Sequence, residues 1–288
     1  MSPGKKFRQA LVENNPLVIP GAINAYSAIL AEQSGHKALY LSGGGVAAAS
    51  YGIPDLGITT MEDVLIDVRR ISNATSLPLL VDIDTGWGGA FNISRTIKEM
   101  IDAGAGAVHM EDQISQKRCG HRPNKSLVSS EEMQDRIKAA VDGRHDESFF
   151  LMARTDAIAS EGINAAIDRA AAYVEQGADG IFLEAATSLE EYKIFKEHIK
   201  TPLLANITEF GKTPLFTKDQ LGDVGVDMVL FPLTAFRAMS KAAEKIYISL
   251  AKDGTQDGLL DIMQTREELY ERLNYHSFEE KLDELYNK

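Results

Sequence analysis

The chain has 288 residues, of which 44% are hydrophobic, and its formal net charge at pH 7 is -12. This length and apolar content suit one large globular core, and α/β barrels often use about 250 residues as a single domain. The negative charge argues against nucleic acid and anionic membranes as partners, and it means that an anionic ligand needs local cations or a metal ion.

Targeting signals are missing from the sequence. No apolar run approaches the roughly 18 residues of a membrane helix, and Met1-Ser2-Pro3-Gly4 does not resemble a secretory signal. The single cysteine, Cys119, allows no internal disulfide. We therefore expect a soluble, cytoplasmic protein.

In chain order, short runs rich in Val, Ile and Leu alternate with longer helical stretches. The runs are residues 17–20, 38–41, 79–83, 107–110, 149–153, 180–183, 203–206 and 228–231. Glycine is favoured just past a helix end, and glycines precede four of the runs, at Gly35, Gly104, Gly177 and Gly225. Short β-rich runs between helices indicate parallel strands.

Three of the helical stretches have a readable start. A Ser or Thr followed three residues later by Glu has the spacing of a capping box, and it occurs in the pairs Thr59 with Glu62, Ser129 with Glu132, and Ser188 with Glu191. Eight strands alternating with helices predict an α/β fold, the (β/α)8 barrel of the TIM type. The alternative is an open doubly wound sheet, but residues 21–24 lack the glycine-rich phosphate loop expected after its first strand.

Polar residues gather where the predicted strands end, at the edge of a barrel that carries active sites. Asp82 and Asp84 are two apart, so we expect both carboxylates to leave the same face of a strand and to hold one hard cation, Mg2+ or Mn2+. Glu111, at the end of the next strand, is expected to join the ligand shell of this cation through water. Strand-end aspartates can instead cap the next helix, but Trp87-Gly88-Gly89 follows here.

Other groups at this edge suit an anionic substrate. Residues 42–45 are predicted to form a glycine loop with backbone amides free to approach an anion. Arg154 and Arg237 each follow a strand end, and a guanidinium can bind two carboxylate oxygens at once. Either arginine could instead be an ordinary ion-pair partner.

Cys119 lies in residues 117–125, among four Lys or Arg side chains and a histidine. Nearby cations favour a thiolate, so we predict that the pKa of Cys119 is lowered and that it acts as a proton donor or nucleophile. Pro123 is expected to stiffen the end of this segment, and we expect the segment to close over substrate. A lone cysteine is more often a small buried hydrophobe, but the apolar neighbours that packing needs are missing here.

Four motifs together resemble the isocitrate lyase and phosphoenolpyruvate mutase superfamily, namely residues 41–45 (LSGGG), 82–86 (DIDTG), 110–113 (MEDQ) and 117–121 (KRCGH). The Cys-Gly-His motif is similar to the lyase branch, and its continuation Arg122-Pro123-Asn124-Lys125 resembles the 2-methylisocitrate lyases. Those enzymes end the methylcitrate cycle of propionate catabolism. The resemblance implies Mg2+-dependent cleavage of a tricarboxylate, 2-methylisocitrate, to pyruvate and succinate.

The resemblance also implies roles for residues. Asp82 and Asp84 would hold Mg2+, with Asp55 and Glu111 nearby; Cys119 would be the general acid and Tyr40 the base. The residues implied to contact substrate are Ser42, Gly43, Gly44, Cys119, Gly120, Arg154, Glu184, Asn206, Ile207, Thr208, Arg237 and Arg266. Choosing 2-methylisocitrate over isocitrate rests on one methyl group, worth about 1 to 3 kcal/mol, and Phe182, Leu230 and Pro232 are placed to shape its pocket.

Beyond the barrel, assigned to residues 1–252, we expect a helical extension at 253–288 in which Thr265 and Glu268 have capping-box spacing. The resemblance implies that this extension packs on the barrel or is swapped onto a neighbouring subunit, and that the protein is a homotetramer. Three alternatives stay open: an isocitrate lyase that releases glyoxylate, another acid-cleaving or phosphonate-forming enzyme of the superfamily, and a non-catalytic binding barrel.

Overall fold

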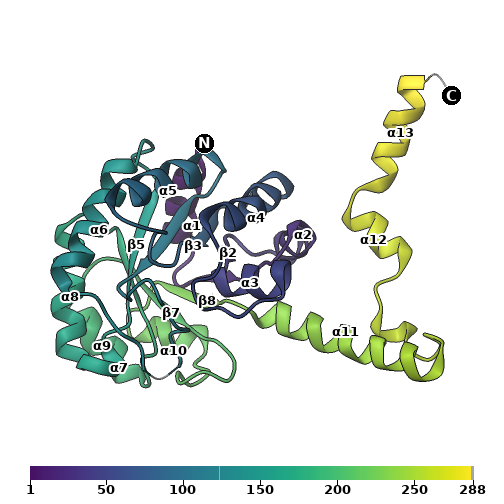
Figure 1. The fold of residues 1–288 in the computed structure, drawn as a ribbon. Coiled ribbons are helices and arrows are strands. Elements are labelled where there is room, and N and C mark those ends of the chain that lie inside the picture. Colours follow the sequence, from purple (N-terminus) through teal and green to yellow (C-terminus); the bar gives the residue numbers. More distant parts are fainter. Residues whose placement is uncertain (123, 287–288) are drawn as a thin grey trace. The chain divides into compact units, whose positions relative to one another are not determined.

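The computed structural model describes residues 1–122 and 124–286 (Figure 1). Pro123, which we expected to stiffen the cysteine segment, lies outside the described residues. The chain divides into two compact units, Met1–Ala235 and Phe236–Lys288. The boundary expected after Lys252 stays a prediction about which segment packs on another subunit.

The first unit is built on an eight-stranded sheet whose paired strands are all parallel within the described residues. Its strands are β1 (Leu17–Pro20), β2 (Leu39–Leu41), β3 (Leu79–Asp82), β4 (Ala107–Glu111), β5 (Phe150–Thr155), β6 (Gly180–Leu183), β7 (Leu203–Asn206) and β8 (Met228–Phe231). They pair in the order β1-β8-β7-β6-β5-β4-β3-β2, and a parallel bridge between Gly21 and Tyr40 brings β1 and β2 together. The sheet is therefore a nearly closed barrel. The predicted TIM-type fold is confirmed, and the open doubly wound sheet is wrong.

Helices surround these strands in Figure 1. They are α1 (Pro3–Glu13), α2 (Ala25–Gln33), α3 (Gly43–Tyr51), α4 (Met61–Ala74), α5 (Ala90–Asp102), α6 (Ser130–Gly143), α7 (Ile158–Glu161), α8 (Ile163–Glu175), α9 (Leu189–His198) and α10 (Lys218–Asp223). Two apolar layers result from the alternation of strand side chains. One lies between strands and helices, and the other fills the interior of the barrel.

The helix α1 closes the amino end of the barrel interior. Phe7 is fully buried among inward-facing residues that include Leu17 and Phe150, and its ring lies 5.3 Å from that of Phe150. Arg8 places its guanidinium over the same Phe150 ring and donates to the backbone oxygen of Ser148. With this end filled, the carboxyl ends of the strands are left for chemistry.

The predicted helix starts are right at two positions and shifted at one. Ser188 and Glu191 form a capping box at α9, and Ser129 accepts a hydrogen bond from the Glu132 amide at α6. At α4 the cap is Thr60, paired with Asp63, so the predicted pair Thr59 with Glu62 is wrong by one residue. The sequence reads Thr-Thr and then Glu-Asp, so both registers satisfy the spacing.

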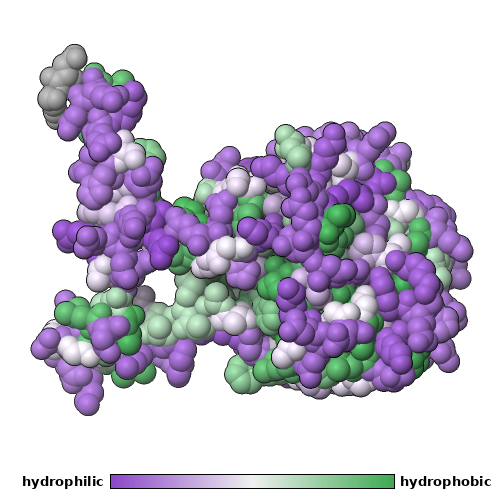
Figure 2. Space-filling model, turned by 180° about the vertical axis from the view of Figure 1, so that it is seen from behind, coloured by the Kyte–Doolittle hydropathy of each residue, from purple (hydrophilic) through white to green (hydrophobic). Residues whose placement is uncertain are grey.

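The second unit contains most of α11 (Thr234–Asp253), the 3-10 turn η1 (Leu260–Ile262), α12 (Arg266–Arg272) and α13 (Tyr275–Tyr286). The expected capping box of Thr265 and Glu268 starts α12. The described residues of these helices include no buried side chain, and large apolar side chains such as Phe278 (72% exposed) lie on the surface. In Figure 2, hydrophobic surface (green) lies among hydrophilic surface (purple). Across residues 1–122 and 124–286, no helix is both long and apolar enough for a membrane crossing.

Candidate active site

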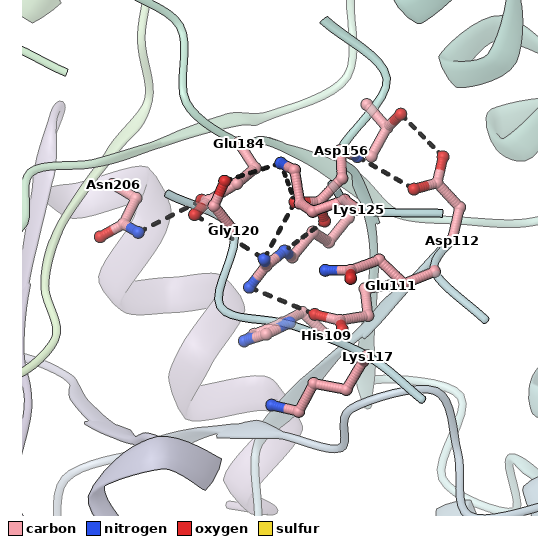
Figure 3. A network of polar contacts seen from close by, with 12 residues as sticks. His109, Glu111, Asp112, Lys117, Gly120, Lys125, Asp156, Glu184 and Asn206 are labelled. Carbon is pink, nitrogen blue, oxygen red and sulfur yellow. Dashed lines mark hydrogen bonds and ion pairs between the residues drawn. The ribbon is translucent and has the colours of Figure 1, made fainter. Parts of the chain in front are cut away.

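Buried charged and polar side chains crowd the carboxyl ends of the strands (Figure 3). They come from β3, β4, β5, β6 and β7 and from the segments just beyond them: Asp82, Asp84, Glu111, Asp112, Arg154, Asp156, Glu184 and Asn206. Such groups are rarely buried without partners, so their contacts define the site.

Asp82 and Asp84 converge on the first residue of α3. The Gly43 amide donates to Asp82 Oδ2 (3.0 Å), and a Cβ placed on Gly43 would lie 3.1 Å from that oxygen and 3.3 Å from Asp84 Oδ1. Our reason for expecting this convergence was wrong, because β3 ends at Asp82 and Asp84 has a left-handed backbone with φ of 48°. An aspartate tolerates that conformation, which turns its carboxylate back toward the barrel mouth.

The glycines at 43–45 form the first turn of a helix instead of the predicted loop. Ser42 is the N-cap of α3 and accepts a hydrogen bond from the Gly45 amide (3.2 Å). Gly44 lies against Asp55, whose carboxylate oxygen would be 2.9 Å from an added Cβ. The small residues thus let the helix start approach the aspartates closely.

Lys117 lies among these carboxylates with only 4% of its side chain exposed. Its Nζ is 2.6 Å from Asp84 Oδ1 and also contacts Asp55 Oδ1. Burial opposes its charge, but Asp84, Glu111 and Asp82 raise the pKa of Lys117 above its usual value. Burial and the neighbouring Asp82 raise the pKa of Asp84 to about 7.

The donor set fits Mg2+ better than a softer metal. Asp82 and Asp84 supply carboxylate oxygens, and the buried Glu111 Oε1 has no hydrogen-bond partner within the described residues. Within the same residues no three His, Cys, Asp or Glu side chains are grouped as a ready metal cage. Two carboxylates completed by water and substrate are how Mg2+ is usually held, so these residues fit the ion.

Arg154 lies at the centre of a cluster of carboxylates. Its Nε and Nη2 donate to the two oxygens of Asp156 at 2.9 and 3.2 Å, and Nη1 is 3.3 Å from Glu111 Oε2. The guanidinium also lies over the Phe182 ring, 5.1 Å from its centroid. Despite burial, Asp156, Glu111 and Glu184 raise the pKa of Arg154, which fixes its charge and orientation.

The cysteine segment lies against this cluster, but its charges differ from our prediction. Cys119 is exposed to solvent, yet desolvation by its neighbours and the Glu184 carboxylate raise the pKa of its thiol. The predicted lowering is wrong because the lysines of the segment are paired with carboxylates: Lys117 with Asp55 and Asp84, and Lys125 with Asp156. The thiol therefore keeps its proton at neutral pH.

His121 joins this segment to two other strand ends. Its Nδ1 accepts a hydrogen bond from the Lys212 amide (3.0 Å), so the proton of the neutral ring is assigned to Nε2, which lies 3.3 Å from Glu184 Oε1. Asn206 donates to the other Glu184 oxygen at 3.2 Å. Glu184, predicted from its strand-end position, is thereby fixed beside Gly120.

Tyr40, our candidate base, is buried beneath the aspartates. Its hydroxyl lies 2.9 Å from His109 Nε2 and 3.5 Å from Asp82 Oδ2. Burial and Asp82 raise the pKa of Tyr40 well above its usual value, so the phenol keeps its proton in this arrangement. Burial lowers the pKa of His109 to about 4, which agrees with a neutral core histidine.

The other predicted residues fall into three groups. Ile207 and Thr208 are buried just after β7. Phe182 and Leu230 fill the barrel interior and Pro232 is buried beyond β8, and the role of these three residues as a pocket wall stays a prediction. Arg237 and Arg266 belong to the second unit, in α11 and α12, and their contacts with substrate stay predictions.

Sequence reasoning missed Lys125 and Asp156 as site residues and saw Lys117 only as part of a cationic field. The pairs Lys117 with Asp84 and Lys125 with Asp156 link the segment after β4 to the ends of β3 and β5. Because the partners are far apart in the sequence, no local spacing predicts these pairs. The one available signal was the density of lysines and arginines beside aspartates at strand ends.

Comparison with known proteins shows what the chain is similar to. Residues 7–251 match the family model described as phosphoenolpyruvate phosphomutase. A 2-methylisocitrate lyase from Shewanella oneidensis is 62% identical over 287 residues, covering 100% of this chain and 98% of that protein.

Two solved structures are also similar to this chain over nearly its whole length. 2,3-Dimethylmalate lyase, a member of the PEP mutase/isocitrate lyase superfamily, has a TM-score of 0.91 and 33% identity, with 99% of this chain and 95% of that chain covered. A phosphonopyruvate hydrolase solved with oxalate and Mg2+ has a TM-score of 0.88 and 30% identity over 100% of both chains.

Proposed function

The chain belongs to the phosphoenolpyruvate phosphomutase family, and we propose that it is a carbon–carbon lyase that cleaves 2-methylisocitrate to pyruvate and succinate. The observation that carries this proposal is the position of the Cys119-Gly120 backbone. It lies directly against Arg154 and Glu184, and Lys117 of the same segment contacts Asp84, one of the two aspartates that suit Mg2+. These contacts support the proposal of an acid, a carboxylate-binding cation and a metal site at one barrel mouth.

Asp82 and Asp84 would hold Mg2+, with Asp55 and Glu111 near it, and Mn2+ has the same ligand preference. When bound, the ion supplies Lewis acidity that lowers the cost of ionising the substrate hydroxyl. The phosphonopyruvate hydrolase solved with Mg2+ supports this assignment.

Carbon–carbon cleavage leaves succinate as a carbanion whose charge is spread over a carboxylate. Arg154, held in place by three carboxylates, is oriented to stabilise that charge before it forms. Cys119 then donates its proton: the S–H bond breaks, a C–H bond forms on succinate, and solvent returns a proton to the sulfur. The raised pKa of the thiol favours this role, because a general acid must arrive protonated.

Tyr40 is our candidate for accepting the hydroxyl proton of the substrate. Burial and Asp82 raise its pKa well above the usual value, so its phenolate form would be a strong base, and its hydroxyl lies 2.9 Å from the neutral His109 Nε2. Substrate carboxylates are proposed to be bound by Ser42, Gly43, Gly44, Gly120, Arg154, Glu184, the residues 206–208, Arg237 and Arg266.

The methyl group that separates 2-methylisocitrate from isocitrate is proposed to contact Phe182, Leu230 and Pro232. Phe182 is fixed on one face by Arg154 and at its edge by His109, 5.0 Å away. Such a wall has little freedom to adjust, which suits discrimination by shape.

We also propose a homotetramer in which the C-terminal helices pack on a neighbouring subunit. The absence of buried side chains in the described part of α11, α12 and α13 supports this. Light scattering of the eluted protein tests it, and a monomer at micromolar concentration would contradict it. The cytoplasmic location stays a prediction.

The test of function is product release from 2-methylisocitrate and from isocitrate, each with Mg2+ and with a chelator, following pyruvate and glyoxylate separately. We expect metal-dependent pyruvate with little glyoxylate. Excess glyoxylate would make the protein an isocitrate lyase. If neither product appears, cleavage of phosphonates and of other 2-hydroxy acids is tested next, and stabilisation by pyruvate and succinate without turnover would indicate a binding barrel.

A further inference from the structure

Lys125 makes two contacts that join the cysteine segment to the barrel wall. Its Nζ donates to the backbone oxygen of Gly120 at 2.7 Å and to Asp156 Oδ1 at 2.6 Å. The lysine side chain is 4% exposed and that of Asp156 is 0% exposed. In Figure 3, Lys125 lies between the two groups that it bonds.

Asp156 is a fixed point of the barrel. Asp112 accepts hydrogen bonds from the Asp156 amide (2.9 Å), the Thr155 hydroxyl (2.8 Å) and the Tyr173 hydroxyl (2.9 Å). These contacts come from β5 and α8, so Asp156 is held from behind by the wall of the barrel.

The same Asp156 orients Arg154. It accepts from Nε and Nη2 of that guanidinium, while its Oδ1 also accepts from Lys125. One carboxylate therefore sets the position of the cation that binds succinate and, through Lys125, of the backbone that carries the acid. Charge-assisted bonds of this kind are short and stronger than neutral ones.

We propose that Lys125 is a positioning residue that fixes Cys119 relative to Arg154 by bonding Gly120 to Asp156. The inference rests on the proposed lyase function, since it assigns Lys125 to the same site. Lys125 touches neither Asp82 nor Asp84, the proposed metal ligands, whereas Lys117, at the other end of the segment, contacts Asp84. The hold exerted by Lys125 therefore persists when Mg2+ is removed.

The experiment compares Lys125→Met with the wild type and with the control Lys138→Met. Lys138 forms an ion pair with Asp135 at the surface, with 55% of its side chain exposed. Hydrogen–deuterium exchange of residues 117–125 is measured with Mg2+ and with chelator. Loss of a buried charge-assisted bond predicts at least about tenfold faster exchange of this segment in Lys125→Met in both conditions, and no change in Lys138→Met.

Kinetics give the second readout. A misplaced acid lowers kcat for 2-methylisocitrate by about ten- to hundredfold, whereas KM changes less than about threefold. Lys125→Arg keeps a charged donor and restores part of kcat. If Lys125→Met does not fold, Lys125→Gln, which loses only the charge and some length, is measured in its place.

Wild-type exchange and wild-type kcat in the Met or Gln variant would overturn the proposal, as would a loss confined to KM. Faster exchange of residues 117–125 that appears only without Mg2+ would also overturn the proposal, because contacts near the metal site would then hold the segment. Absence of 2-methylisocitrate cleavage in the wild type refutes the lyase assignment alone, since exchange still reports the hold by Lys125.

Discussion

We expect Gly120→Ala to reduce turnover strongly while leaving the fold intact. A Cβ on Gly120 would overlap Glu184 Oε1 and Arg154 Nη2 at separations well under 3.0 Å, which real Cβ atoms essentially never show. Neither neighbour can move aside easily, because Glu184 bonds Asn206 and Arg154 bonds Asp156. The backbone must retreat from the site instead.

Forcing one methyl group into a packed site costs about 1 to 3 kcal/mol. Since about 1.4 kcal/mol corresponds to a factor of ten, kcat/KM should fall by roughly 5- to 150-fold. The same strain weakens the fold, and because 1 kcal/mol shifts the melting temperature of a large domain by about 2–4 °C, that temperature should fall by about 2 to 12 °C while the protein stays folded.

The assay is pyruvate release from 2-methylisocitrate, with thermal unfolding measured on the same samples. Gly89→Ala is the matched control, because an added Cβ there meets no heavy atom within 4 Å. Full activity in Gly120→Ala would refute the reasoning, because the segment would then not need to approach Arg154 and Glu184. Equal losses in both variants would refute it as well.

The remaining predictions concern the acid, the metal and the pocket. Cys119→Ser should lower kcat by about 10²- to 10⁴-fold while thermal stabilisation by pyruvate and succinate is kept; unchanged turnover would exclude the acid role. Because the pKa of Cys119 is raised, wild-type kcat/KM should persist above the usual thiol pKa and fall only at higher pH, and an alkaline fall at or below pH 8.5 in the pH–rate profile would contradict this. A chelator should abolish pyruvate release and added Mg2+ restore it, whereas turnover in chelator would rule out the metal role. Phe182→Trp should change the ratio of kcat/KM for the two substrates at least about tenfold, and an unchanged ratio would count against the pocket.

Much of the fold follows from local composition. The runs at 17–20, 180–183, 203–206 and 228–231 agree with the observed strands to the residue, because each is a buried strand between helices that end at glycine or turn residues. The polar residues that follow them end up at one edge because parallel strands share a direction.

The errors arise where the chain departs from a regular element or where distant residues meet. Asp84 lies past the end of β3 in a left-handed conformation. The alternation of side chains along a strand, from which we argued, does not predict this conformation. The pKa of Cys119 depends on which carboxylates pair with Lys117 and Lys125, and those carboxylates are 31 or more positions away in the chain or on other strands. A cluster of positive residues in a sequence therefore does not imply a positive potential at each of its members.

The closure of the amino end of the barrel by Phe7 of α1 affects which substitutions this enzyme can accept. Because α1 occupies the interior there and the chemistry is gathered at the other end, changes at the two ends meet only in the interior cluster, which also holds Phe182 and Leu230. Substitutions around Phe7, Leu17 and Phe150 are suited to adapting the protein to another temperature, and exchange of residues at the opposite rim to adapting it to another acid. An evolving or engineered lineage can thus acquire heat tolerance at one end and a new specificity at the other while it keeps Phe182 and Leu230, the interior residues that connect them.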